Sequence, residues 1–304
     1  MLKEYALDPE CLKEWSTFRY LIENFGVSQG RLIAEFPRKW VKMAYAACGS
    51  FSFRQKQLAE IQLKRLKKAG LCKSNRPYDS GCKWLENAIR QQAHNPFHAI
   101  VSCISNIEAK VVDAHELTQA EPLWRTEKDR KILRTTKELG GAVSKLLQIS
   151  DRILFVDKMF DPETDRWKEL LLHFIGIASR GREIPPTFEY HTKIENEEYG
   201  KPEDVRTRDF QQVCQRELVD RLPDGCLIKI VRWDQRHGAD FFHSRYILTE
   251  KGGLRIDWGL DVSRKAGETT DISLLDEDLW RGYWAWFARR EGPLEFVDEV
   301  KVVR

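Results

Sequence analysis

The segment FFHSRYILTEKGGLRIDWGL, residues 241–260, decides the fold of the C-terminal half of this chain. It holds two runs rich in aliphatic and aromatic residues, 241–249 and 254–260, with Lys251–Gly252–Gly253 between them. Apolar runs of this length on either side of a glycine turn predict a β-hairpin.

Upstream of the hairpin, strand and helix patterns alternate. The apolar runs ILFVDKMF (153–160), TFEYHT (187–192) and CLIKIVRW (226–233) are typical of strands, and helical spacing fills 164–179 and 205–222. This order predicts parallel strands with the hairpin as an antiparallel edge. Ligands bind beyond the carboxyl ends of the parallel strands in open sheets of this kind, and those ends carry Asp157, Asp161, His191, Trp233 and Asp234. For Asp157 and Asp161, capping of the next helix is the favoured alternative to metal binding.

The two ends of the chain are expected to be helical. Apolar spacing predicts helices within 10–25, 31–47, 54–69, 83–93, 97–118 and 127–149. Near the C-terminus, Trp280, Tyr283, Trp284 and Phe287 form a stripe that favours a core or dimer interface over a base-stacking platform, and a strand-like tail follows. We therefore expect an α+β protein, with a basic helical domain at 1–150 and an α/β domain with a mixed sheet at 151–304.

Charge is distributed unevenly along the chain. Residues 38–90 hold 13 basic and 3 acidic residues, although the whole chain has a net charge of only +3. Such a segment is typical of contact with a polyanion or an acidic partner. The alternatives are a solvated helix face and a face docked on the acidic C-terminal half. The candidate nucleic-acid-binding residues are Arg38, Lys39, Lys42, Arg54, Lys64, Arg65, Lys67 and Lys68.

Composition predicts a cytoplasmic protein without a membrane span. No apolar run approaches the roughly 20 residues that cross a bilayer, and the first residues interleave charged and apolar side chains. The seven cysteines are odd in number and irregularly spaced, which argues against a disulfide framework.

The strand at 241–249 carries the candidate chemistry. His243 and Arg245 share one face because side chains alternate along a strand, and Glu250 follows at the strand end. An imidazole can attack phosphorus or donate a proton near neutral pH, while a guanidinium holds two phosphate oxygens. A carboxylate can orient the imidazole. These residue types together favour a phosphodiester site.

The stretch HSRYILTE (243–250) resembles the phospholipase D superfamily motif, His-x-Lys followed after four residues by Asp, with Arg and Glu as substitutes. The longer stretch HSRYILTEKGGLRIDWGLD (243–261) is most similar to the phospholipase D-like domain found C-terminal to MIT modules and in bacterial relatives. The resemblance covers about 151–262 and is strongest in its last twenty residues.

This resemblance implies a metal-independent phosphodiesterase, without a cofactor, that assembles its site from two motifs. One copy per chain implies a homodimer. His243 would then be nucleophile and acid, Arg245 the phosphate clamp, and Glu250 and Asp261 orienting groups. Together with the basic N-terminal half, it favours a nuclease, for which bacterial defence is a setting that family association suggests.

Two departures from the family pattern keep alternatives open. Arg replaces Lys, and Trp258–Gly259–Leu260–Asp261 stands where Gly-Ser-x-Asn is usual. One alternative is a non-catalytic adaptor that binds phosphorylated ligands or nucleic acid and docks a larger complex. Another is a structural His243 in the core.

A zinc site is the weaker hypothesis. Cys72, Cys82, His94 and His98 could be ligands, because His-x3-His is a known spacing. The cysteines are not closely paired and Pro96 lies between the histidines, so a structural role for these residues is favoured.

Overall fold

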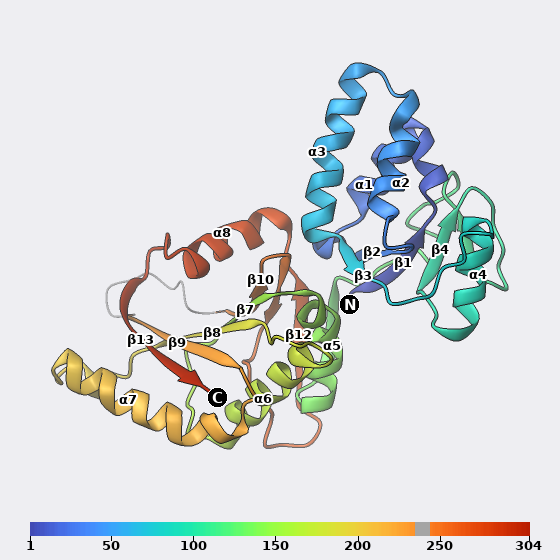
Figure 1. Ribbon diagram of the computed structural model, residues 1–304. Helices are drawn as coiled ribbons and strands as arrows, with labels where there is room; N and C mark the ends of the chain where they lie inside the picture. Colours follow the sequence, from blue (N-terminus) through green and yellow to red (C-terminus); the bar gives the residue numbers. More distant parts are fainter. Residues whose placement is uncertain (235–243) are drawn as a thin grey trace. The chain divides into compact units, whose positions relative to one another are not determined.

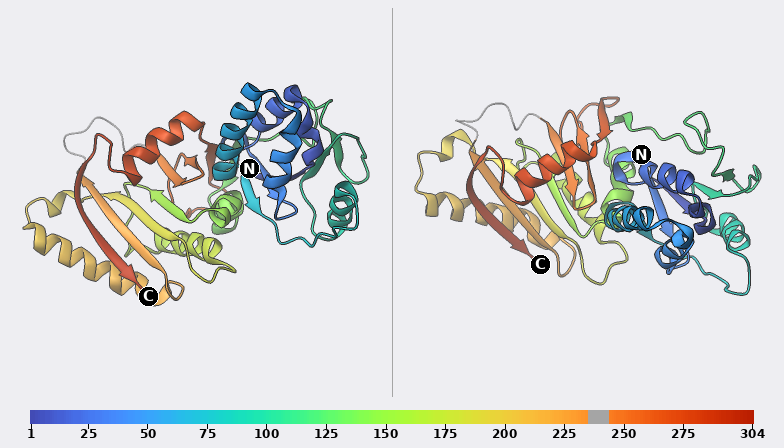
Figure 2. Two further views of the ribbon diagram at one scale, coloured as in Figure 1. Left: turned by 45° about the horizontal axis from the view of Figure 1, so that its top comes forward. Right: turned by 90° about the horizontal axis from the view of Figure 1, so that it is seen from above.

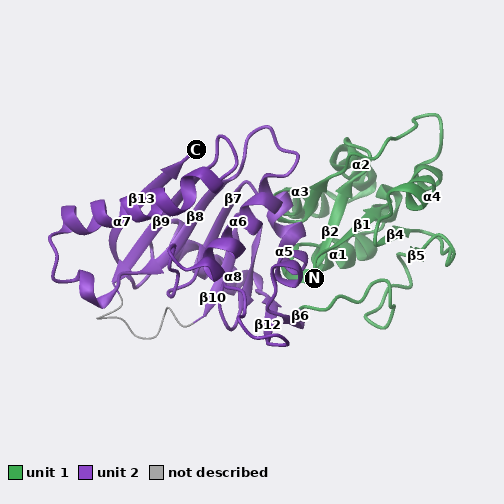
Figure 3. Cartoon of the chain, turned by 90° about the horizontal axis from the view of Figure 1, so that it is seen from below, with its two compact units in different colours: residues 1–128 green, residues 129–304 purple. Residues whose placement is uncertain are grey.

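The computed structural model describes residues 1–234 and 244–304, and it divides the chain into two compact units, Met1–Lys128 and Asp129–Arg304 (Figures 1 and 3). Helices and strands are both abundant, which confirms the α+β class. The unit boundary lies at 128/129 and not at 150/151, because the segment 129–149 contributes a strand and a helix to the second unit.

The first unit is built on a parallel sheet of five strands in the order β3-β2-β1-β4-β5, so the prediction of a purely helical domain was wrong. The strands are β1 (Lys3–Leu7), β2 (Arg31–Glu35), β3 (Leu71–Lys73), β4 (Ala99–Ser102) and β5 (Val111–Asp113). Strands of three to five residues are too short to show a period of two. The predicted helix at 97–118 is instead β4 and β5.

The helices of the first unit are α1 (Trp15–Asn24), α2 (Trp40–Ala47), α3 (Phe53–Ala69) and α4 (Trp84–His94), and the first three share one apolar cluster with the sheet. Side chains of α1, α2 and α3 pack with those of β1, β2 and β4 around the buried Trp40 and Trp124. Helix α3 begins with a capping box in which Ser52 and Gln55 satisfy each other's backbone N–H groups.

The second unit has a mixed sheet of eight strands in the order β13-β9-β8-β7-β10-β11-β12-β6. Strands β7, β8 and β9 are parallel, as predicted. The hairpin β10/β11 is antiparallel but lies inside the sheet, because β12 and β6 extend it. The strands are β6 (Asp129–Leu133), β7 (Arg152–Val156), β8 (Thr187–Lys193), β9 (Leu227–Asp234), β10 (Arg245–Thr249), β11 (Gly252–Ile256), β12 (Thr269–Leu274) and β13 (Glu295–Val303).

Helices lie on both faces of this sheet (Figures 1 and 2). Phe155 of β7 stacks on Phe174 of α6 on one face. The other face of β7, with Leu154 and Val156, packs against α8, where Phe287 is buried. The helices are α5 (Thr136–Ile149), α6 (Asp165–Ser179), α7 (Glu203–Leu218) and α8 (Glu277–Ala288).

The aromatic stripe of α8 is part of the core, as predicted. Trp280, Tyr283 and Trp284 are partly buried against the cluster that contains Phe287. Gly253 of β11 allows this close packing, because a Cβ atom there would lie 2.8 Å from Leu248 Cδ2 and 2.9 Å from Leu275 Cδ1. Gly253 therefore serves core packing and does not form the turn, which is made by Glu250 and Lys251.

The first unit should lose stability in mild acid because of His98. Burial, and then the nearby Lys3, lower the pKa of His98 from 6.5 to about 4, and its ring packs edge-on against Tyr5. A histidine that is held neutral in the folded state stabilises it above pH 6.5, and this stability is lost as the pH falls toward 4. We expect His98→Gln to reduce the acid loss of unfolding free energy by about 1–3 kcal/mol between these limits. Urea unfolding at several pH values measures this, and equal pH slopes in both proteins would contradict it.

Candidate functional site

A buried carboxylate lies directly after β7, at the carboxyl end of the parallel strands. Asp157 is only 1% exposed. It accepts hydrogen bonds from the backbone N–H groups of Met159 at 3.0 Å and Leu260 at 2.8 Å. Burial raises the pKa of Asp157, while these two donors and the charge of Arg245 oppose the shift. Asp157 thus anchors the loop after β11 to the end of β7.

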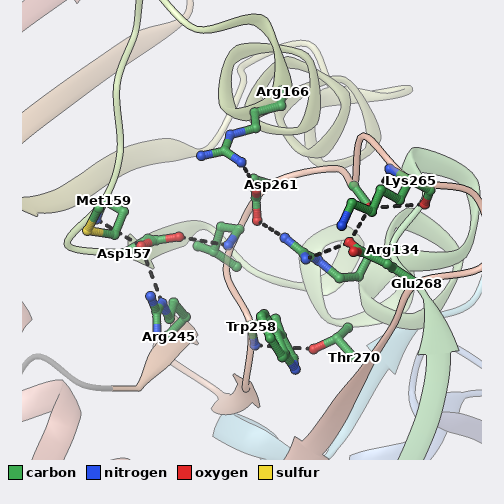
Figure 4. A network of polar contacts seen from close by, with 12 residues as sticks. Arg134, Asp157, Met159, Arg166, Arg245, Trp258, Asp261, Lys265, Glu268 and Thr270 are labelled. Atoms are coloured by element: carbon green, nitrogen blue, oxygen red, sulfur yellow. Dashed lines mark hydrogen bonds and ion pairs between the residues drawn. The ribbon is translucent and has the colours of Figure 1, made fainter.

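The same loop places a second buried carboxylate, Asp261, between two arginines (Figure 4). Arg134 Nη2 donates to Asp261 Oδ1 at 2.5 Å, and Arg166 Nη1 lies 3.4 Å from Oδ2. Arg134 follows β6, and Arg166 is in the first turn of α6. Asp261 therefore joins three segments that are distant in sequence.

Arg245 completes this group from the first residue of β10. Its Nε lies 3.5 Å from Asp157 Oδ1. Together with Trp258, the three arginines and two aspartates line a cavity of about 230 Å³, whose other walls are Met159 and Trp167. We call this set of residues, Arg134, Asp157, Arg166, Arg245, Trp258 and Asp261, the arginine site.

The arginine site is suited to a small anion. Each guanidinium group offers five N–H donors in a plane and binds phosphate oxygens in pairs. The contacts with Asp157 and Asp261 use only some of the donors of the three arginines taken together. The Nε atoms of Arg134 and Arg166 are buried and make no hydrogen bond. The carboxylates orient the arginines and limit the net positive charge of the cavity.

Glu250 is not part of this site, so its predicted role as an orienting group was wrong. Its carboxylate accepts hydrogen bonds from the N–H groups of Asp151 and Arg152 at 3.0 and 3.1 Å, at the start of β7. Arg245 pairs with the other end of β7, since Tyr246 lies opposite Val156. Arg245 and Glu250 are therefore separated by the full length of the five-residue strand β10, which rises by about 3.3 Å per residue.

His243 lies outside the described residues, and its predicted catalytic role stays a prediction. The arrangement of Arg245 and Asp261 agrees with the expectation that both belong to one site. Arg245 contacts Asp157, and Asp261 contacts the other two arginines.

The other polar residues at the strand ends have structural roles. Asp161 accepts hydrogen bonds from Glu163 N–H and Thr164 Oγ1 in the turn before α6, whose N-cap Thr164 has no side-chain capping bond, so Asp161 holds this turn and does not cap the helix. His191 is fully buried and accepts a hydrogen bond from Trp233 Nε1 at 3.1 Å. Asp234 accepts a hydrogen bond from the Tyr199 hydroxyl at 2.8 Å.

Sequence patterns do not identify Arg134 and Arg166 as site residues. Arg166 carried a usable signal: a cation in the first turn of a helix is unfavourable to the helix dipole, so it needs a local reason. Arg134 gives no such signal, because it directly follows a strand in a segment predicted to be helical.

The basic residues of the first unit are on its surface. All eight candidates are exposed, and six basic side chains of α3 lie outside the buried face of that helix. That face consists of Ala59, Leu63 and Leu66, whereas Leu58 and Ile61 are exposed.

No zinc cluster forms within the described ranges 1–234 and 244–304. Cys72 is buried in β3, Cys82 contacts Asp79, and no group of three potential metal ligands is found there. All seven cysteines are free thiols. Over the same ranges, no helix is long and apolar enough to span a bilayer.

No protein-family model and no curated protein matches this sequence. Among solved structures, the chain has a weak similarity to TrmBL2, an archaeal chromatin protein whose structure shows a novel mode of DNA binding. The match has 11% identity and a TM-score of 0.28, and it covers 60% of this chain and 59% of that chain. At this level, neither fold nor function is carried over.

Gly259 should be essential to the arginine site. Its φ is +146°, and a Cβ atom would lie 2.7 Å from Asp261 Oδ1 and 3.3 Å from Asp157 Oδ2. We expect Gly259→Ala to lower the free energy of unfolding by about 1–3 kcal/mol or more, because strain and displaced carboxylates add. Gly267→Ala is the control, since Gly267 also has a positive φ, +83°, but open space around it. Equal losses in the two variants, measured by chemical denaturation, would show that the carboxylates are not held as described.

Proposed function

We propose that the second unit binds a phosphodiester at the arginine site and cleaves it with His243 as nucleophile. The observation that carries this proposal is the cavity where Arg134, Arg166 and Arg245 meet beside two buried aspartates. Three guanidinium groups converging on one small cavity favour an anion with several oxygens. His243 precedes Arg245 by two residues, and the sequence resemblance to phospholipase D-like domains supports its role.

The proposed reaction needs no metal ion. Arginine side chains hold the non-bridging oxygens and stabilise the charge that develops on them. A ring nitrogen of His243 attacks phosphorus, a P–N bond forms, and the bond to one ester oxygen breaks. That oxygen takes a proton from the partner subunit's His243. Water then attacks phosphorus, gives a proton to the partner subunit's His243, and releases the first His243.

In this proposal the aspartates act as positioning residues. Asp261 fixes Arg134 and Arg166, and Asp157 fixes Arg245 and the loop that carries Asp261. Neither one needs to touch the substrate.

Nucleic acid is the proposed substrate class because of the first unit. Its exposed basic residues between 38 and 68 provide the sequence-independent attraction that phosphate backbones require. Cytoplasmic location and assembly as a homodimer complete the proposal, since one motif per chain requires two chains for a site with two histidines.

Removal of His243 tests the activity. Single- and double-stranded DNA and RNA are incubated in EDTA with wild type, His243→Ala, Arg245→Ala and Arg255→Ala. We expect His243→Ala and Arg245→Ala to reduce cleavage at least about 10²-fold, because nucleophile and phosphate clamp are lost. Arg255 is the matched control, as an exposed arginine on the neighbouring strand β11 that pairs with Asp257. Two outcomes would contradict a His243 phosphodiesterase: His243→Ala cleaves at the wild-type rate, or none of the four proteins cleaves any substrate.

A phosphate-binding adaptor is the second candidate, and one observation favours it. Each arginine of the site already has a carboxylate partner, so the three arginines and two aspartates leave the resting cavity only one formal positive charge. Such a site can recognise a phosphorylated ligand without promoting its cleavage. Binding of the oligonucleotides that depends on Arg245, without turnover, would support this role.

A further inference from the structure

Trp258 is an exposed aromatic side chain at the edge of the arginine site. It is 67% exposed, although large apolar side chains gain about 1.5–3 kcal/mol from burial. Its backbone is held in place, because Trp258 N–H donates to Thr270 Oγ1 at 3.3 Å and the neighbouring Asp257 N–H donates to the Asp271 carbonyl oxygen at 3.1 Å. The ring therefore projects from an ordered turn between β11 and β12.

The ring lies close to the proposed phosphate position. Trp258 lines the same cavity as the three arginines, and the guanidinium carbon of Arg134 is 5.7 Å from its ring centroid. Figure 4 shows the ring between Arg245 and Arg134 in that view. Of the two aromatic side chains that line this cavity in the described part of the chain, Trp167 is buried and Trp258 is exposed.

The size of the cavity decides which part of a ligand can enter. Its volume of about 230 Å³ is below the range of about 300–1,000 Å³ that encloses most organic ligands. A phosphoryl group fits, whereas a whole nucleotide does not. The sugar and base of a bound nucleotide must therefore lie outside the cavity, along its rim.

Charge disfavours one of the directions in which a nucleic-acid strand could leave. A neighbouring hollow of about 460 Å³ shares Arg166 with the arginine site, and its other charged lining residues are Arg264 and the three carboxylates Glu163, Asp165 and Glu169. Three carboxylates against two arginines give this hollow a net negative lining, so a phosphate backbone is better placed on the side of Trp258.

We infer that Trp258 is a stacking platform for an unpaired nucleobase next to the bound phosphate, which makes single-stranded nucleic acid the preferred ligand. Bases stack on aromatic side chains when they are splayed out of a helix, and this interaction tolerates any base. In a duplex the bases are stacked on each other, so Trp258 can contribute little. The inference rests on the proposed phosphate site and names its substrate class.

The test measures equilibrium binding by full-length protein in the His243→Ala background, which is intended to prevent turnover. The probes are a fluorescent single-stranded oligonucleotide, its abasic version, the matching duplex, and inorganic phosphate. The variants are Trp258→Leu, Trp258→Phe and, as the control, Leu279→Ala, which removes an exposed apolar side chain from α8. Because Trp258 is exposed, thermal unfolding should show all of them folded.

We expect Trp258→Leu to weaken binding of the single strand about 5- to 100-fold, with Trp258→Phe retaining most of the affinity. Binding of the abasic strand, the duplex and phosphate should change less than 2-fold, as should all binding by Leu279→Ala. If the single strand binds Trp258→Leu as tightly as it binds the parent protein, the stacking role is overturned while the phosphate site stands. If neither phosphate nor any oligonucleotide binds the parent protein, the proposed function fails, and the inference fails with it.

Discussion

The hydrogen bond from Leu260 N–H to the buried carboxylate of Asp157 is the constraint on which the second unit's site depends. It joins the end of β7 to a loop 103 residues later. Gly259 makes this approach possible, since any side chain there would collide with the carboxylate oxygens. The position of Asp261 follows directly, because it is the next residue after Leu260. The rest of the site is organised around these two carboxylates.

Two buried carboxylates require compensation. An ionised side chain taken out of water is strongly destabilised unless it is paired and hydrogen-bonded. Backbone donors and Arg245 compensate Asp157, and Arg134 and Arg166 compensate Asp261. The same requirement explains why three arginines converge, one directly after β6, one in α6 and one in β10. A stability requirement thus produces an arrangement that can also hold an anion.

Sequence patterns predicted the second unit better than the first, for physical reasons. Buried strands such as 153–156 form long apolar runs, and the hairpin at 245–256 has two apolar strands that flank a short polar turn, although the two glycines expected in the turn belong to β11. The first unit's strands are too short to show periodicity, and propensity favoured helix around them. The boundary was placed too late because the edge strand 129–133 is mostly charged and exposed.

The site was only partly predictable. Arg245 and Asp261 belong to a recognisable motif, and the strand-end position of Asp157 marked it as a candidate. Glu250 fits the motif in sequence, yet strand β10 carries it to the opposite end of the sheet. Arg134 reaches Asp261 only through the order of strands β11, β12 and β6, and no local pattern encodes this order.

The most direct measurement is calorimetric titration of inorganic phosphate into wild type, Arg166→Gln and Arg255→Gln. Arg166 is the most accessible of the three arginines at 35% side-chain exposure, so its loss should leave the unit folded, with Asp261 still paired to Arg134. We predict that wild type and Arg255→Gln bind phosphate equally, and that Arg166→Gln binds it at least about 10-fold more weakly. No binding by wild type, or equal binding by all three proteins, would contradict an anion site built on these arginines.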